Sequence, residues 1–280
     1  MNRLPDEKRI QILNLLVEGM SMRAVSRVVG VSINTVVKLL EDAGIACDNF
    51  HNENVRNLPS TLIQCDEIWS FCYAKDKKVE KGLKGNPDCA GSIWTWTALD
   101  AESRFMVSWC VSESRDTTYA EIILLDVRSR VPGRFQLTTD GLKSYEEAAH
   151  RVFGSEVDFA QLVKIEGTGE DAGRIIGSEI MPRIGNPNPL RASTSLMERH
   201  NLTTRMHQRR YTRRTNAHSK KLERHCYSLA LYLVWYNFCR EHSTLGTLKT
   251  PAMAVGLSDR PYGLDWLLRL VDAQIENSSN

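Results

Sequence analysis

The sequence has no CxxC pair among its seven cysteines, which are Cys47, Cys65, Cys72, Cys89, Cys110, Cys226 and Cys239. Structural zinc sites usually take ligands from such close pairs, so their absence argues against a zinc ribbon. The cysteine count is odd, the spacing is irregular, and 280 residues are too many for a small disulfide scaffold. We therefore expect reduced thiols in a cytoplasmic protein.

Long apolar runs are also missing. No stretch approaches the roughly 20 apolar residues that a membrane-spanning helix needs, so we expect no membrane partner. The first residues, MNRLPDEKRIQ, are charged and lack the apolar core of a signal peptide. No internal repeat or low-complexity tract is visible. With 42% hydrophobic and 25% charged residues, the composition is that of a globular protein with a sizeable core.

An excess of one charge is absent from the whole chain but present locally. The formal net charge is only +2, yet residues 199–224 contain nine basic residues opposed by Glu223 alone. These basic residues are Arg199, Arg205, Arg209, Arg210, Arg213, Arg214, Lys220, Lys221 and Arg224. On a helix, Glu198, Asn201, Arg205 and Arg209 share one face. This positive strip fits a DNA phosphate backbone, and a solvated basic helix is the alternative.

The first 44 residues show helical patterns in three parts. Residues 6–18 carry an apolar stripe, Ser21 is suited to cap a helix ending near Val29, and Ser32 is suited to cap another ending near Asp42. Gly30 supplies the tight turn between them, which is a helix-turn-helix pattern. The last of these helices would enter the major groove with Asn34, Thr35 and Lys38 among its contacts. A plain three-helix packing unit is the alternative.

The remainder of the chain alternates strands and helices. Residues 45–60 are polar and contain Asn and Pro, which predicts a linker. Residues 61–258 predict three strands, a helix, a strand, a helix, a further strand and two long helices at about 193–216 and 219–241. Within this region, residues 167–192 are rich in Gly and Pro and predict a loop or insertion, and residues 259–280 form a C-terminal tail. This order predicts a mixed α/β sheet, and it is the element order of the ribonuclease H-like fold.

Three acidic residues occupy three different places in this pattern. Asp66 lies inside the first strand, Asp140 ends a later strand, and Glu198 lies on a helix. Acids on neighbouring strands and on a crossing helix are able to converge, and hard cations such as Mg²⁺ or Mn²⁺ take oxygen ligands. Two such ions would serve phosphodiester chemistry. The alternatives are that Asp140 caps a turn and Glu198 is a surface residue. Glu67 should point to the opposite strand face, solvated or ion-paired.

The segments around these acids resemble a known family. QCDEIWSF, WTWTALDAESR, LTTDGLKSYEEA and STSLMERHNLTTRMHQRRYTRRTNAHSKKLERH, in that order, resemble transposases of the insertion sequence one (IS-one) family. The segment YNFCREHSTLGTLKTPAMAVG resembles the C-terminal tail common in that group, so the likeness covers about residues 60–257. The N-terminal cysteine zinc motif described for the founding type is missing here. Residues 75–87 and 167–192 are candidates for insertions.

The resemblance implies a DDE transposase with an RNase H-like core preceded by a small all-α helix-turn-helix domain. It implies that Asp66, Asp140 and Glu198 hold two divalent ions, with Arg205 at the basic position seven residues after the glutamate. We expect double-stranded DNA partners, namely the element's terminal repeats and the target. We also expect a homo-oligomeric synaptic complex on the nucleoid of a prokaryotic cell. Strand cleavage by water would leave a 3′-hydroxyl that attacks the target DNA.

Three other functions remain open at the level of sequence. A helix-turn-helix regulator with an inactive second domain would not bind metal at the three acids. A recombinase with a covalent intermediate would need a nucleophile such as Tyr211, which lies among arginines. A nuclease of the same fold that acts on RNA would differ in its substrate.

Overall fold

The computed structural model describes residues 3–81, 89–169, 172–212 and 216–279. The chain forms two compact units, which we treat separately. The first unit, here called the helical unit, consists of Met1–Val55, Trp69–Ile93 and Leu202–Asn280. The second, here called the sheet unit, consists of Arg56–Ile68 and Trp94–Asn201. Within the described ranges, no helix is both long enough and apolar enough to span a bilayer.

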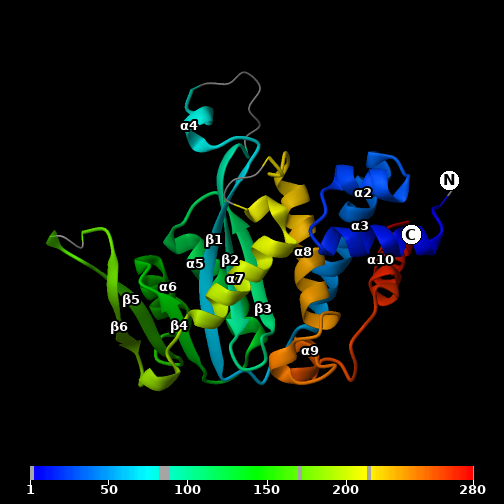
Figure 1. Ribbon diagram of the computed structural model, residues 1–280. Coiled ribbons are helices and arrows are strands. Elements are labelled where there is room, and N and C mark those ends of the chain that lie inside the picture. Colours follow the sequence, from blue (N-terminus) through cyan, green and yellow to red (C-terminus); the bar gives the residue numbers. More distant parts are fainter. Residues whose placement is uncertain (1–2, 82–88, 170–171, 213–215, 280) are drawn as a thin grey trace. The chain divides into compact units, whose positions relative to one another are not determined.

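A six-stranded mixed sheet runs in the order β3-β2-β1-β4-β5-β6 (Figure 1). The strands are β1 (Leu62–Cys72), β2 (Gly91–Asp100), β3 (Met106–Ser112), β4 (Gln136–Asp140), β5 (Asp158–Glu166) and β6 (Ile175–Ile184). Strand β4 is parallel to both β1 and β5, whereas β2–β3 and β5–β6 are antiparallel. The prediction of a mixed α/β sheet is therefore confirmed.

Helices α5 (Thr117–Arg130) and α6 (Lys143–Phe153) belong to the sheet unit and pack against each other. Asp116 starts α5 by accepting hydrogen bonds from the backbone amides of Thr118 and Tyr119, which a helix N-terminus leaves without intrahelical partners. The buried face of α5 carries Ala120, Ile123, Leu124 and Val127. This i, i+3, i+4, i+7 spacing places the four side chains on one face of the helix.

Strand β6 corrects the prediction of a loop at residues 167–192. Ten residues of that segment, Ile175–Ile184, pair with β5 in an antiparallel ladder. The strand is mostly exposed, contains Gly177 and Pro182, and lacks apolar alternation. Its stability comes from backbone hydrogen bonds to a neighbour, which a search for side-chain patterns does not detect.

The helical unit contains α1 (Asp6–Val17), α2 (Met22–Val29), α3 (Ile33–Asn54), α4 (Asp76–Val79), α8 (Leu222–Phe238), α9 (Pro251–Ala254) and α10 (Leu264–Ser279). Helix α7 (Ser195–His207) runs from the sheet unit into the helical unit. Three short 3-10 helices are η2 (Pro189–Arg191), η3 (Arg209–Tyr211) and η4 (Ser243–Leu245).

The predicted caps of the N-terminal helices are confirmed. Ser21 accepts a hydrogen bond from the Ala24 amide, and Ser32 accepts one from the Thr35 amide. Gly30 ends α2 with φ +68°, a left-handed conformation that glycine adopts without steric cost.

The linker predicted at residues 45–60 is wrong over most of its length, because α3 continues to Asn54. Ala46, Cys47 and His51 are buried and extend the inward face of the helix. Phe50 makes edge contacts with Phe238 of α8 and Trp266 of α10, with ring centroids 5.2 and 5.1 Å apart. Polar residues such as Asp48 and Asn52 hid this stripe because they occupy the other face of the same helix.

The predicted C-terminal helices also differ from the observed ones. The first ends at His207 rather than near residue 216, and the second runs over Leu222–Phe238. The tail predicted at residues 259–280 contains the 16-residue helix α10. The functional boundaries proposed for the domains (1–44, 45–60, 61–258 and 259–280) stay predictions.

Candidate functional site

Asp66 and Asp140 lie on neighbouring parallel strands of the sheet unit. Strand β1 pairs with β4 through Leu62 opposite Gln136 and Gln64 opposite Thr138. Continuing this register by two residues places Asp66 beside Asp140, where β4 ends. One side chain oxygen from each of Asp66, Glu67 and Asp140 lies within 4.8 Å of the others. The structure thus brings together two of the three predicted acids and adds Glu67.

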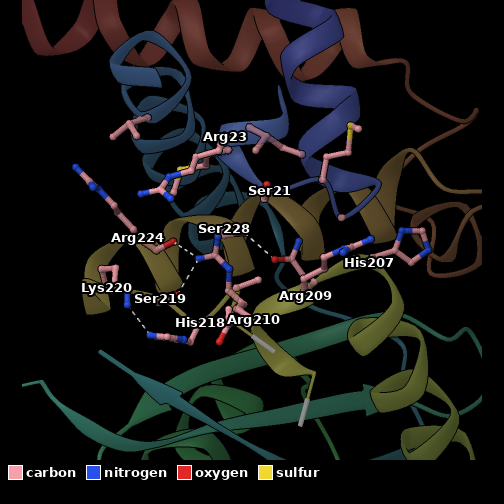
Figure 2. A pocket seen from close by; sticks show the side chains of 18 of the residues that line it. Ser21, Arg23, His207, Arg209, Arg210, His218, Ser219, Lys220, Arg224 and Ser228 are labelled. Atoms are coloured by element: carbon pink, nitrogen blue, oxygen red, sulfur yellow. Dashed lines mark hydrogen bonds between the residues drawn. The ribbon is translucent and has the colours of Figure 1, made fainter. Parts of the chain in front are cut away.

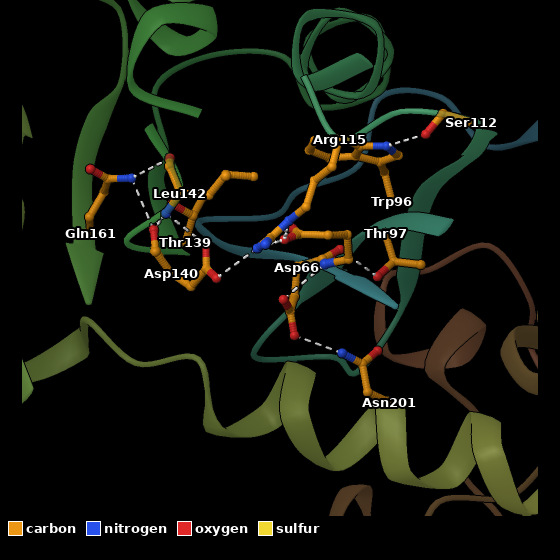
Figure 3. A network of polar contacts seen from close by, with 11 residues as sticks. Asp66, Trp96, Thr97, Ser112, Arg115, Thr139, Asp140, Leu142, Gln161 and Asn201 are labelled. Atoms are coloured by element: carbon orange, nitrogen blue, oxygen red, sulfur yellow. Dashed lines mark hydrogen bonds and ion pairs between the residues drawn. The ribbon is translucent and has the colours of Figure 1, made fainter. Parts of the chain in front are cut away.

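Glu67 was expected on the opposite face, solvated or ion-paired, and it is ion-paired but not solvated. Its carboxylate is buried and binds the guanidinium of Arg115. Arg115 also lies 3.4 Å from Asp140 and 5.1 Å from the centre of the Trp94 ring (Figure 3). The Glu67 oxygen Oε2 is buried and accepts no hydrogen bond from the described part of the chain. Strand alternation alone could not reveal that Glu67 reaches the cluster, because Arg115 comes from the distant loop before α5.

Burial and mutual repulsion raise the pKa values of Asp66 and Glu67. Burial, followed by the charges of Asp140 and Glu198, raises the pKa of Asp66 to about 6. Burial, followed by the charges of Asp140 and Asp66, raises the pKa of Glu67 to about 7. Arg115 opposes both shifts. A group of carboxylates held this close favours either bound protons or a bound cation.

Glu198 lies in the first turn of α7 and is not one of the three clustered acids. Its side chain is half exposed and lies 3.6 Å from the ammonium of Lys164. Its charge nevertheless raises the pKa of Asp66. One turn later, Asn201 donates a hydrogen bond of 2.7 Å from Nδ2 to Oδ2 of Asp66 (Figure 3). Sequence reasoning placed Asn201 against DNA and missed this contact.

The start of α7 is fixed on the strands that carry the site. The Met197 amide donates a hydrogen bond of 3.0 Å to the Gln64 side chain of β1. The Thr97 hydroxyl of β2 lies 3.4 Å from the Met197 sulfur and 3.1 Å from the Asp66 carbonyl oxygen. Residues 197–201 therefore lie beside Asp66, and Glu198 is the acid that this turn presents.

The arginines of the basic segment that are predicted to contact DNA differ in how far their side chains are exposed. Arg205 is half-buried on the last part of α7, Arg209 is exposed, and Arg210 is partly exposed. Arg213 and Arg214 lie outside the described residues.

In the N-terminal helices, Asn34 is exposed at the start of α3, as the prediction of a DNA contact requires. Thr35 is half-buried, and its hydroxyl lies 2.8 Å from that of Ser32. The exposed Lys38 pairs with Asp42 at 2.5 Å. These residues stay predictions as DNA contacts.

The donor set of the cluster suits a hard divalent cation. Every candidate ligand atom is a carboxylate oxygen, which Mg²⁺ and Mn²⁺ prefer. The buried Oε2 of Glu67 has no hydrogen-bond donor among described groups, so an incoming cation would satisfy a group that is costly to leave alone. Cys65 adjoins Asp66, but burial raises the pKa of its thiol far above the usual value, so it stays protonated and is no ligand.

Comparison with known proteins gives structural likeness only. No protein family and no curated protein sequence matches the chain. A simian T-cell lymphotropic virus intasome, solved with the PP2A regulatory subunit B56 gamma, aligns over 87% of this chain and 73% of that chain, with 13% identity and a TM-score of 0.40. A piggyBac transposase synaptic complex with hairpin DNA aligns over 99% and 74%, with 9% identity and a TM-score of 0.42.

The Mos1 strand transfer complex aligns over 56% of this chain and 59% of that chain, with 14% identity and a TM-score of 0.24. All three TM-scores are below 0.5 and all three identities are below 15%. The assignment of function therefore depends on the geometry of the site itself.

Proposed function

We propose that this chain is a DDE-type transposase of the IS-one group, with an RNase H-like catalytic core, that cleaves and joins DNA strands. The catalytic acids are Asp66, Asp140 and Glu198. The observation that carries the proposal is the convergence of Asp66, in the middle of β1, with Asp140, where the parallel strand β4 ends, and Glu198 lies on the helix turn beside them. Phosphodiester cleavage requires such a group of oxygen ligands.

The acids would hold two Mg²⁺ or Mn²⁺ ions, which activate an attacking oxygen and stabilise a leaving one when bound. Asn201 holds Asp66 in place by donating to Oδ2 and leaves Oδ1 facing the Glu67 amide. Arg115 neutralises part of the charge by pairing with Glu67 and Asp140. These contacts keep a repulsive cluster folded, because each carboxylate oxygen that leaves water needs a partner.

The proposed substrate is double-stranded DNA. Helices α2 and α3 would bind the terminal repeats of the element, with Asn34, Thr35 and Lys38 in the major groove. Arg205, Arg209, Arg210, Arg213 and Arg214 would contact phosphates. A homo-oligomeric complex would hold two ends together, and a 3′-hydroxyl released by hydrolysis would attack the target strand.

The recombinase with a covalent tyrosine is disfavoured by the environment of Tyr211. This side chain is 1% exposed, and its hydroxyl lies 2.8 Å from Nε2 of the buried His225. A nucleophile must reach the phosphorus atom of its substrate, and a hydroxyl packed inside the helical unit does not.

The test is strand cleavage of DNA carrying the sequences that flank the gene, with Mg²⁺ and the full chain. Asp66→Asn should abolish cleavage, by at least about a thousandfold, because it removes a charged ligand of the metal. Binding of the same duplex in a mobility-shift assay should change less than about threefold, because Asp66 is not one of the residues predicted to read the terminal repeats. Retained cleavage by Asp66→Asn would overturn the assignment.

The matched control is Glu156→Gln, which removes a surface acid of the sheet unit whose pair with Arg128 is exposed. Such pairs contribute little, so cleavage should persist. Titration with Mn²⁺ provides a second measurement, in which the wild type and Glu156→Gln should bind Mn²⁺ and Asp66→Asn should not. A wild type that binds DNA but not Mn²⁺ would favour the regulator, and one that cleaves only RNA would favour the RNA nuclease.

A further inference from the structure

A pocket of about 590 Å³ lies within the helical unit, away from the catalytic acids in sequence (Figure 2). Its walls come from the end of α1, the start of α2, the start of α3, residues 207–210, residues 216–220 and the first turns of α8. These segments fall in two distant stretches of the chain, 16–37 and 207–228, and the second includes much of the basic segment noted in the sequence.

Cationic side chains line the pocket without acidic ones. Among the described lining residues there are five permanent cations and no Asp or Glu. The cations are Arg23, Arg209, Arg210, Lys220 and Arg224, and Figure 2 shows them around the opening. Arg224 pairs with Glu41, whereas Arg23 and Arg209 form no ion pair with a described carboxylate. A concave surface with this charge concentrates anions.

Arg210 is the best fixed of these cations. Its Nη1 donates hydrogen bonds to Ser219 Oγ at 3.2 Å and to the Arg224 carbonyl oxygen at 2.6 Å. Ser219 in turn contacts the ring of His225, which lies against Tyr211. Burial lowers the pKa of Arg210 only to about 10, so the guanidinium stays charged at neutral pH. The guanidinium is held by neutral partners and forms no ion pair with a carboxylate in the described part of the chain, and an anion would supply a counter-ion.

Another part of the pocket lining is apolar. It consists of Leu16, Met20, Met22, Ile33 and Val37, of which Met20 is 37% and Ile33 is 39% exposed. Methionine and branched side chains give a flat and adaptable surface for a planar ring. The N-terminus of α2 contributes Ser21, Met22 and Arg23 to the lining, and the helix dipole at that end also favours a negative group.

We propose that this pocket binds a single unpaired nucleotide of a DNA strand. Arg209, Arg210 and Arg23 would hold the phosphate, and the methionine wall would pack against the base. An intact duplex is too wide to enter a cavity of this volume, whereas one nucleotide fits. That the bound strand is DNA rests on the proposed function. The charge and the shape of the pocket are observed independently of that function.

The experiment measures fluorescence anisotropy of a labelled ten-residue thymidine strand bound to the full chain without divalent ions. Arg23→Gln and Arg209→Gln should each weaken binding about tenfold, since each loses a charge-assisted contact. Arg260→Gln is the matched control, because Arg260 is an exposed cation of the same helical unit that lies outside α2, α3 and the basic segment and does not line the pocket. It should bind as the wild type does. Circular dichroism checks that each variant is folded.

Competition identifies the ligand. Unlabelled thymidine monophosphate should displace the strand from the pocket, whereas inorganic phosphate at the same concentration should not. Equal displacement by inorganic phosphate would overturn the proposal in favour of an anion site. Equal loss of duplex and single-strand binding in Arg23→Gln would overturn it in favour of an ordinary backbone contact.

The two proposals fail in different ways. If Arg23→Gln and Arg209→Gln bind the strand as Arg260→Gln does while the wild type still cleaves DNA, only the pocket assignment is wrong. If both weaken binding but the wild type binds no Mn²⁺ and cleaves nothing, the pocket stands and the transposase function fails.

Discussion

Asp66 and Glu67 are adjacent on β1, yet one carboxylate oxygen from each meets Asp140 in one cluster. Strand geometry sends neighbouring side chains to opposite faces, and the length of the glutamate side chain together with Arg115 overcomes that separation at the sheet edge. Glu67 is therefore a buried acid of the cluster, and Arg115 balances its charge. The site therefore binds protons more tightly than the unfolded chain does.

This difference predicts a pH-dependent stability of the metal-free protein. The pKa of Glu67 rises from 4.5 to about 7, and that of Asp66 rises from 3.8 to about 6, on folding. The folded state thus holds more protons between about pH 4 and pH 7. The contribution of these groups to the free energy of unfolding is therefore largest at acidic pH and falls as the pH rises toward 7.

The measurement is the melting temperature with a chelator from pH 4.5 to 7.5. Relative to the wild type, Glu67→Gln should gain on the order of 1–3 kcal/mol of stability as the pH rises across this window, because the neutral amide does not ionise. Glu156→Gln should show no such trend. A constant difference between Glu67→Gln and the wild type at every pH would contradict the raised pKa.

At the scale of elements, α3 and α8 approach each other closely at Gly44. A Cβ at this position would lie 2.3 Å from Cβ of Tyr227 and 2.5 Å from its Cα. These are backbone and near-backbone atoms, which cannot rotate away. Gly44 is therefore retained inside a helix by packing, even though glycine is a poor helix former.

Gly44→Ala tests which effect is larger. Helix propensity alone would stabilise the variant by about 1 kcal/mol. Forcing α3 and α8 apart should cost more, so we expect a net loss of about 1–3 kcal/mol in urea denaturation. Glu53→Ala, on an exposed position of α3, should change the free energy of unfolding by less than about 0.5 kcal/mol. A more stable Gly44→Ala would show that the helices separate without cost.

At the scale of the whole molecule, the helical unit is built from both ends of the chain. Arg9 of α1 and Asp272 of α10 are joined by an ion pair of 2.5 Å, in which the arginine side chain is only 6% exposed. Arg3 also binds Asp272, and both arginines lower the pKa of that carboxyl. The apolar residues Leu267, Leu268 and Val271 of α10 are buried around this pair.

Asp272→Asn should destabilise the helical unit. It leaves the buried guanidinium of Arg9 with only the exposed Asp6 as a described charged partner. Removing one partner of a fully buried pair costs roughly 3–5 kcal/mol, and the cost is smaller here because Asp272 is 22% exposed. We expect a loss of about 2 kcal/mol in thermal unfolding and faster amide exchange in α1 and α10. Asp265→Asn, at an exposed pair with Arg269 on the same helix, is the control. Equal effects of the two substitutions would contradict the importance of burial.

By itself, the sequence determined the features that arise within a few residues. Ser21, Ser32 and Gly30 set the ends of α2 and α3, because caps and left-handed turns are local. Asp66 and Asp140 stood out because each interrupts or ends an apolar strand, and the alternation of elements predicted a mixed sheet.

Only the tertiary structure decided what depends on distant partners. It added β6, which is stabilised by the backbone of β5, and it extended α3 to Asn54 against α8 and α10. It brought Glu67, Arg115 and Asn201 to Asp66, and it closed the cationic pocket from six separate segments. The physical reason is that long-range hydrogen bonds, ion pairs and burial satisfy groups whose own neighbours in the chain give no sign of the partner.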